Sequence, residues 1–438
     1  MDWREIYKQK RVSVEEAAKV IKSNDRVFAM AASGLPYELL KEIDKRRNEL
    51  ENVTVMSGIV LYPYEFFKPG SQGGIRFTSV FMGPFERMGC SQGTVDVFAY
   101  QFGKIDYTTR NVFKGNVFCI EVSPPDDNGD MSFGVMGTLC GKIAVEHADT
   151  VIVSVNKRTP YVYGPKEAFV NVKDVDYICE HDHEIPELPD APITDIDRQI
   201  AHHIVSRIDD GATIQIGIGG LGNAVGFFLE GHKDLGIHTE MLVDSMISLA
   251  EKGVVNGKRK TLHPNEIIFS FGLGKKKLYD FVHKNDAVKA HPIDYVGNPY
   301  TIGRNSQFVS INNALMCDLT GQVCSESVGY RQFSATGGQL DFVRGAQLSP
   351  GGQSFIALES TTKQKDGTLL SRITCALPPG AVVTTPRTDV QYVVTEHGIA
   401  DLKCKSIKDR IREMIRVAHP QFRDQLEKEA RENHFYES

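Results

Sequence analysis

Residues 210–245 read DGATIQIGIGGLGNAVGFFLEGHKDLGIHTEMLVDS, and this stretch decides the fold of the chain. It predicts a strand over residues 213–218, a glycine-rich turn, a short helix over residues 223–229 and a second strand that ends at Glu240. The turn contains Gly217, Gly219, Gly220 and Gly222. Glycines let backbone N–H groups approach a ligand, and the N-terminus of a helix attracts anions. The stretch therefore predicts a site for a ligand that carries phosphates.

The identity of that ligand stays open at this point. The spacing Gly217-x-Gly219-x-x-Gly222 matches the dinucleotide-binding fingerprint, and Glu240 follows about 20 residues later, where an acid binds a ribose hydroxyl. The same geometry serves other nucleotides, including coenzyme A. Glu240 itself is either an ordinary surface or ion-paired glutamate or a functional one, as its place beside the glycine turn suggests. His238 shares its face of the strand and either orients Glu240 or only packs there.

The composition limits the class of protein. The chain has 438 residues, which favours two domains, and its 41% hydrophobic and 24% charged residues are typical of soluble globular proteins. A net charge of −6 argues against nucleic acid or an anionic membrane as partner, and no apolar run approaches the roughly 20 residues of a spanning helix. The eight cysteines form no CxxC pair, so we expect reduced thiols, a cytoplasmic location and no zinc site.

A helix–strand–turn–helix unit occurs twice in the chain. In the first copy, a strand predicted over residues 26–31 leads into Ser33-Gly34-Leu35-Pro36 and a helix. In the second copy, isoleucines at four-residue intervals predict a helix that starts near Thr194 and precedes the glycine turn. Alignment of the two copies places residues 33–36 on residues 219–222. The sequence therefore predicts an α/β fold of two related domains with open, mostly parallel sheets.

The segment between the two copies has the proline and acidic content of a linker. We therefore divide the chain into an N-terminal domain over residues 1–185, a linker over residues 186–193 and a C-terminal domain over residues 194–438. His181 and His183, with flanking carboxylates, suggest a metal, but no further ligand is placed to complete a site. We predict no metal.

Several other segments are candidates for the site or the sheets. Gly337 and Gly338 offer further backbone N–H groups to a ligand, although such a pair is more often a tight turn. The turn-rich loop over residues 123–130 is either a ligand loop or a plain connection. Strands are predicted over residues 308–315, 382–385 and 392–395, and the tail from residue 406 onward is predicted to be mostly helical.

Taken together, GIGGLGNAV, LGIHTEM, SINNAL, FSATGGQLDFVRGA and VVTEHGIADLKCKS resemble the acetyl-CoA hydrolase/transferase family, and the resemblance covers nearly the whole chain. It implies two related domains with the active site between them. It also implies transfer of coenzyme A between short-chain carboxylic acids, such as 4-hydroxybutyrate or butyrate and acetate. Coenzyme A is then a substrate, no separate cofactor is needed, and the expected assembly is a homodimer or a higher homo-oligomer.

The resemblance also assigns roles to residues. Glu240 matches the catalytic glutamate, which carries coenzyme A as a glutamyl thioester in a ping-pong reaction. Because the reference pKa of glutamate is about 4.3, we expect this nucleophile to be ionised near neutral pH. The coenzyme A contacts fall on Gly217, Ile218, Gly219, Gly220, Leu221, Leu315, Gly337 and Gly338. Two alternatives remain, an acyl-CoA hydrolase on the same scaffold and a nicotinamide-dependent dehydrogenase.

Overall fold

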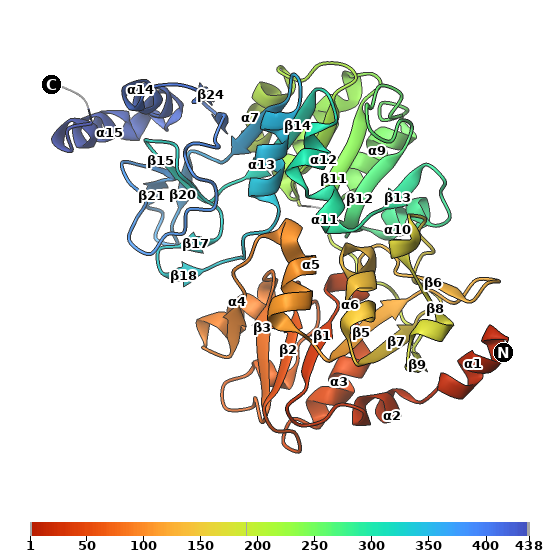
Figure 1. Ribbon diagram of the computed structural model, residues 1–438. Helices are drawn as coiled ribbons and strands as arrows, with labels where there is room; N and C mark the ends of the chain where they lie inside the picture. Colours follow the sequence, from red (N-terminus) through yellow and green to blue (C-terminus); the bar gives the residue numbers. More distant parts are fainter. Residues whose placement is uncertain (1, 190, 436–438) are drawn as a thin grey trace.

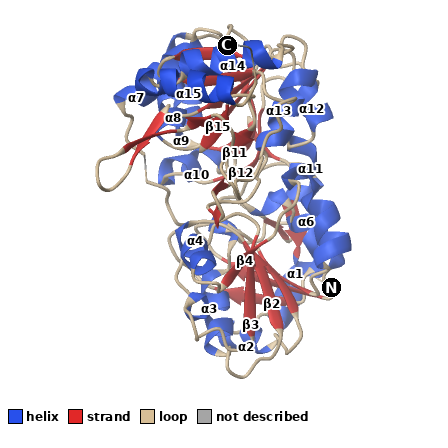
Figure 2. Cartoon of the chain, turned by 90° about the vertical axis from the view of Figure 1, so that its left-hand side faces the viewer, coloured by secondary structure: helices blue, strands red, loops and turns tan. Residues whose placement is uncertain are grey.

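The computed structural model describes residues 2–189 and 191–435. Two large sheets dominate it, one in each half of the chain, with the N-terminal half below the C-terminal half in Figure 1. Helices lie on both sides of each sheet (Figure 2). No helix among the described residues is both long and apolar enough to cross a membrane.

The N-terminal sheet has seven strands, all parallel, in the order β4-β3-β2-β1-β5-β7-β9. Its strands are β1 (Arg26–Ala29), β2 (Val53–Ser57), β3 (Ile75–Ser79), β4 (Val95–Val97), β5 (Val117–Val122), β7 (Thr150–Val155) and β9 (Tyr177–Glu180). The helices of this half are α1 (Trp3–Lys10), α2 (Val14–Lys19), α3 (Tyr37–Lys45), α4 (Pro84–Ser91), α5 (Ile105–Tyr107) and α6 (Gly141–His147). A small hairpin pairs β6 (Asp130–Ser132) with β8 (Phe169–Asn171).

The C-terminal sheet has eight strands in the order β13-β12-β11-β10-β14-β19-β23-β24, and only β24 is antiparallel to its neighbour. Its strands are β10 (Thr213–Ile216), β11 (Gly236–Leu242), β12 (Ile267–Gly272), β13 (Val288–Ala290), β14 (Phe308–Asn313), β19 (Gln353–Ala357), β23 (Tyr392–Thr395) and β24 (Gly398–Asp401). The first seven strands of this sheet follow the same spatial order as the seven of the N-terminal sheet. The predicted α/β fold of two related, mostly parallel sheets is confirmed.

The remaining helices and strands belong to the C-terminal half. Its helices are α7 (Asp195–Val205), α8 (Gly220–Phe228), α9 (Asp244–Glu251), α10 (Lys276–Val282), α11 (Ile293–Val296), α12 (Pro299–Gly303), α13 (Gln339–Leu348), α14 (Ile407–Val417) and α15 (Pro420–Glu432). A smaller lobe carries β15 (Met316–Asp318), β16 (Val323–Cys324) and β22 (Ile373–Thr374), with the hairpins β17 (Ser327–Val328)–β18 (Arg331–Gln332) and β20 (Thr361–Lys363)–β21 (Leu369–Ser371). Helices α14 and α15 confirm the helical tail.

Some predicted boundaries are wrong. The strand β10 ends at Ile216 and α8 begins at Gly220, so the turn is shorter than predicted, because Gly219 has a φ of 103° and reverses the chain at once. Glu240 lies inside β11, which continues to Leu242. Residues 382–385 are not a strand. They make only an isolated bridge at Thr385 and leave apolar side chains exposed.

The predicted linker lies where regular secondary structure is absent. Residues 181–189 and 191–194 form neither helix nor strand, and residue 190 lies outside the described residues. The segment is nevertheless anchored, since Leu188 N–H donates to the Gly274 carbonyl and the Tyr279 hydroxyl donates to the Pro186 carbonyl. The domain boundaries at 185 and 194 stay a prediction.

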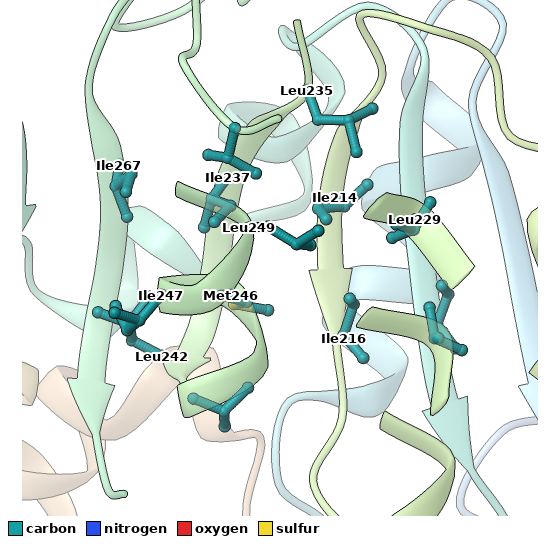
Figure 3. Packing of buried hydrophobic residues seen from close by; sticks show 14 of the residues in the cluster. Ile214, Ile216, Leu229, Leu235, Ile237, Leu242, Met246, Ile247, Leu249 and Ile267 are labelled. Atoms are coloured by element: carbon teal, nitrogen blue, oxygen red, sulfur yellow. The ribbon is translucent and has the colours of Figure 1, made fainter. Parts of the chain in front are cut away.

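The two halves share a hydrophobic core. One core cluster lies mainly in the C-terminal half, where side chains of β10, β11 and β12 pack against α8 and α9 (Figure 3), and it also includes Val135 and Val162 of the N-terminal half. A second cluster contains residues of both halves, and in it Phe102, which follows β4, meets Phe271 of β12 with ring centroids 6.2 Å apart. Both residues lie at the carboxyl ends of their sheets. Burial of apolar surface therefore holds these two sheet edges against each other.

The third glycine of the fingerprint is required by packing. A Cβ atom on Gly222 would collide with the Gly217 carbonyl oxygen, because the first turn of α8 lies directly on the glycine turn. We expect Gly222→Ala to destabilise the protein by about 1–3 kcal/mol, as overpacking does. Denaturant unfolding measures this. Gly231→Ala is the control, since a Cβ atom there meets nothing within 4 Å, and an equal effect of both substitutions would contradict the steric cause.

Candidate active site

Glu240 and Gly338 form the centre of the candidate site. Glu240 projects from β11, and Gly338 is the residue directly before α13. A Cβ atom on Gly338 would collide with Oε2 of Glu240, so no other residue fits there while the carboxylate keeps this position. The backbone N–H of Gly338 is close enough to the carboxylate to act on its pKa. Two segments that lie far apart in the sequence thus meet at one carboxyl group.

The surroundings of Glu240 change its ionisation. The pKa of Glu240 is raised to about 8, mainly by burial and to a smaller extent by the negative charge of Asp341, while the Gly338 N–H opposes both. Asp341 lies in the first turn of α13, and burial raises its own pKa to about 6. The expectation that Glu240 is ionised at neutral pH is therefore wrong for the free site. The sequence could not show this, because the pKa depends on the neighbours that folding supplies.

Asp341 also connects the two halves of the protein. The Gly103 N–H, on the loop after β4, donates to Oδ2 of Asp341 over 3.0 Å. A Cβ atom on Gly103 would lie 3.0 Å from that same oxygen, so the backbone of the loop approaches closely. The acid that raises the pKa of Glu240 is thus held by a hydrogen bond from the N-terminal half.

The glycine turn presents an open face. The φ of 103° at Gly219 is one that only glycine adopts easily, yet a Cβ atom there meets nothing within 4 Å, and one on Gly217 has its nearest neighbour at 3.6 Å. Ile218 is 47% exposed. A cavity of about 150 Å³ lies beside the turn, lined by residues that include Gly217, Gly219 and, from the linker, Leu188. The turn has room for a ligand.

Hydrogen bonds join the turn to the other predicted elements. Asn313, the last residue of β14, donates through Nδ2 to the Ile218 carbonyl over 3.0 Å. Gln339, the first residue of α13, donates through Nε2 to the Asn313 carbonyl over 2.9 Å. The structure therefore brings together the glycine turn, the end of β14 and Gly338. Leu315 lies two residues beyond β14, is half-buried and pairs with the Cys324 carbonyl; its contact with a ligand stays a prediction.

The N-terminal half contributes residues that the sequence did not reveal. Phe81 follows β3, and its ring lies 3.1 Å from a Cβ atom placed on Gly337. Tyr100 follows β4, and its hydroxyl is buried. Both residues are aromatic and come directly after short parallel strands, where α/β sheets bind ligands. That position was the only signal available in the sequence, and it does not distinguish these aromatics from core residues.

Three other candidates have structural partners. His238 is fully buried, its Nε2 lies 2.9 Å from the Val296 carbonyl, and burial lowers its pKa to about 3. Nε2 of His183 lies 2.6 Å from the buried Glu121 carboxylate. In the loop over residues 123–130, Asp126 accepts hydrogen bonds from its own turn and from Tyr161. Among the described residues, no group of three or more His, Cys, Asp or Glu side chains could hold a metal ion.

A cavity of about 460 Å³ lies elsewhere on the interface between the halves. Its lining includes Arg110, Lys142 and His291, but neither Glu240 nor the glycine turn. This cavity is larger than the one beside the glycine turn, but its lining contains none of the predicted site residues. The candidate active site rests instead on the carboxylate, the backbone donor and the open turn, which together supply a nucleophile, a stabilising N–H group and room for a phosphate-bearing ligand.

The chain was compared with known proteins. Residues 1–189 match the acetyl-CoA hydrolase/transferase N-terminal domain and residues 274–430 the C-terminal domain. It is 42% identical to 4-hydroxybutyrate coenzyme A transferase of Clostridium kluyveri (97% of this chain, 98% of that one) and 38% identical to butyryl-CoA:acetate CoA-transferase of Anaerostipes caccae (98% of each). The crystal structure of RipA from Yersinia pestis matches with a TM-score of 0.93, 33% identity and full coverage of both chains. The chain belongs to the acetyl-CoA hydrolase/transferase family and is a CoA-transferase enzyme.

Proposed function

We propose that this enzyme transfers coenzyme A between short-chain carboxylic acids, with 4-hydroxybutyrate or butyrate on one side and acetate on the other. The proposal extends to this chain the substrates for which its relatives are named. The observation that carries the mechanism is the contact between the Glu240 carboxylate and Gly338 at the start of α13. Glu240 is the nucleophile, and coenzyme A is a substrate rather than a resident cofactor.

The reaction consists of two exchanges at Glu240. The carboxylate attacks the acyl-CoA carbonyl, the C–S bond breaks, and a mixed anhydride and coenzyme A thiolate form. The thiolate then attacks the glutamyl carbonyl, which releases the first acid as a carboxylate and leaves a glutamyl-CoA thioester. A second acid reverses these steps. The energy of the thioester is kept throughout because each bond to sulfur is replaced by an anhydride or by another thioester.

Gly338 has the geometry of an oxyanion donor. Each addition to the glutamyl carbonyl puts negative charge on an oxygen, and Gly338 lies against this group at the N-terminal end of a ten-residue helix. Removal of one such donor typically lowers the rate of an enzyme by about 10²–10³. The absence of a side chain at Gly338 is what lets the N–H come so close.

The open glycine turn supports binding of coenzyme A. Its backbone faces a cavity at the carboxyl end of β10, the strand that pairs with β11, and β11 carries Glu240. Phosphates bind well at such turns, since backbone N–H groups and a helix N-terminus face them. Binding of this remote part of the substrate supplies free energy that holds the thioester at Glu240. Nicotinamide chemistry has no comparable support, since the chain belongs to a family of coenzyme A enzymes.

Hydrolysis is the second candidate function, because the family includes acetyl-CoA hydrolases. Water that reaches the glutamyl-CoA thioester would release coenzyme A without a second acid. Dependence of the turnover on added carboxylate separates the two functions. A transferase needs the acid, whereas a hydrolase turns over at full rate without it.

We also propose a homodimer or higher homo-oligomer in the cytoplasm. The oligomer rests on the family resemblance alone, and sedimentation at micromolar concentration that shows only a 48.7 kDa species would contradict it. The location is supported by the eight cysteines, all of which are free thiols, as in proteins of a reducing compartment.

The covalent intermediate gives a direct test. Intact-protein mass spectrometry after mixing with butyryl-CoA, without an acceptor acid, is expected to show a coenzyme A adduct on the peptide that contains Glu240, and acetate should remove it. Glu240→Gln should form no adduct, because an amide is not a nucleophile here. Glu230→Gln is the control, since Glu230 is exposed and pairs with Lys252. An adduct on any other residue contradicts the assignment.

The raised pKa of Glu240 predicts a pH profile. Only the ionised carboxylate attacks, so kcat/KM for the acyl-CoA should rise with pH, by about tenfold per unit well below pH 8, and level off above the pKa of about 8. Asp341→Asn removes the negative charge that raises this pKa, so the midpoint should move to lower pH. The amide oxygen can still accept from Gly103. If Asp341→Asn does not change the midpoint of the pH profile, Asp341 does not act on the pKa of Glu240.

A further inference from the structure

Tyr100 has a buried hydroxyl that lacks a partner. It lies on the loop after β4, and among the described residues no group forms a hydrogen bond with its Oη. Buried tyrosine hydroxyls are usually paired, and a buried polar group without a partner costs stability. Such a hydroxyl either binds a ligand or destabilises the folded protein without a function. Its position decides between these two possibilities.

Aromatic packing places Tyr100 beside the candidate active site. Its ring centroid lies 5.8 Å from Phe98 and 6.2 Å from Phe102, and Phe102 in turn packs on Phe271. Phe271 is paired in register with Met241, the neighbour of Glu240 on β11. The hydrogen bond from Gly103 to Asp341 fixes the other end of the same loop. The loop therefore lies next to Asp341 at the interface of the two halves, with Tyr100 near enough to Glu240 to interact with it electrostatically.

Charge and burial keep the Tyr100 hydroxyl protonated. Burial raises its pKa well above the usual value, and the acidic neighbours Cys140 and Glu240 act in the same direction. The group is therefore available as a hydrogen-bond donor at any pH at which the enzyme works. It does not bond the Glu240 carboxylate, whose own donor is Gly338. A substrate oxygen can therefore serve as its acceptor.

The substrates bring one group that needs such a donor. A free carboxylate leaves Glu240 in the first exchange and enters in the second, and the charged side chain that acts on Glu240 is another acid, Asp341. While the free acid is bound, Glu240 is acylated, so the anion lies near Asp341 and benefits from a hydrogen-bond donor that keeps its proton. We propose that the Tyr100 hydroxyl binds the carboxylate of the departing and the entering acid at Glu240. This role rests on the proposed function.

The exchange balances without transfer of the tyrosine proton. The entering carboxylate oxygen attacks the glutamyl carbonyl carbon, the C–S bond breaks, and coenzyme A leaves as the thiolate. The thiolate then attacks the acyl carbonyl, and the C–O bond to the glutamyl group breaks, which returns the Glu240 carboxylate. Tyr100 donates to the oxygens of the acid throughout and keeps its proton. The Tyr100 hydroxyl therefore binds substrate and does not stabilise the folded protein.

The test uses Tyr100→Phe, which removes only the hydroxyl. Glutamyl-CoA enzyme is prepared from wild type and variant with butyryl-CoA, and the rate of discharge is measured with acetate, which gives acetyl-CoA, and with water alone, which gives free coenzyme A. A hydrogen bond to a charged group corresponds to roughly a 10- to 100-fold change. We expect discharge by acetate to fall by that factor and discharge by water to stay unchanged, because water carries no carboxylate.

Stability supplies an independent readout. Tyr100→Phe should not lower the Tm, because the hydroxyl has no partner to lose. Tyr64→Phe is the matched control. The Tyr64 hydroxyl donates to the Tyr37 carbonyl over 3.3 Å, away from Glu240, so this variant should lower the Tm and leave discharge by acetate unchanged.

Three results would overturn the role of Tyr100. They are discharge by acetate that is unchanged in Tyr100→Phe, equal loss of both discharge reactions, and a Tm that falls as it does for Tyr64→Phe. Failure of the wild-type enzyme to form any adduct is a different outcome, because it contradicts the proposed function itself. The two failures are therefore distinguishable in the same experiment.

Discussion

The absence of a side chain at Gly338 is the constraint on which the site depends. It lets the first turn of α13 come into contact with the Glu240 carboxylate, and any larger residue would collide with Oε2. The surrounding contacts maintain this approach. A hydrogen bond from Gln339 connects the start of α13 to Asn313. A hydrogen bond from Asn313 connects the end of β14 to the glycine turn. The Glu240 carboxylate, Gly338 and the open glycine turn are thereby connected through β14 and the start of α13.

The two halves share a topology but contribute different residues to the candidate site. When the two repeated units are aligned, Val27 of β1 corresponds to Thr213 of β10. The register of β1 with β2 and that of β10 with β11 then place Ile59 of the N-terminal half at the position of Glu240. Ile59 has a φ of 48°, which is unusual for a β-branched residue, and follows β2 instead of lying within a strand. The N-terminal half thus carries no acid at the matching position. It contributes the loops after β3 and β4, which bring Phe81 to Gly337 and Gly103 to Asp341, and which carry Tyr100.

The parts of the site that the sequence predicted are those encoded locally. The glycine turn follows from four glycines in six residues, and the duplicated unit follows from strand, turn and helix signals in order. Tyr100 and Asp341 could not be predicted in the same way, because they reach Glu240 only through the packing of distant segments. For residues 382–385, the sequence predicted a strand that the structure does not contain. Their apolar run resembles a strand, but the segment pairs with β16 only through the single bridge at Thr385, and Val382 and Val383 are left 37% and 42% exposed.

Asp341 couples reactivity to the docking of the two halves. Its carboxylate accepts from Gly103 of the N-terminal half, and its charge raises the pKa of Glu240 in the C-terminal half. Separation of the halves would expose both acids to water and return both pKa values toward their usual range. The unusual ionisation of Glu240 is therefore a property of the closed interface and not of β11. An intact interface keeps a poorly solvated carboxylate beside the substrate, and such a carboxylate gains most when its charge passes to the thiolate of coenzyme A.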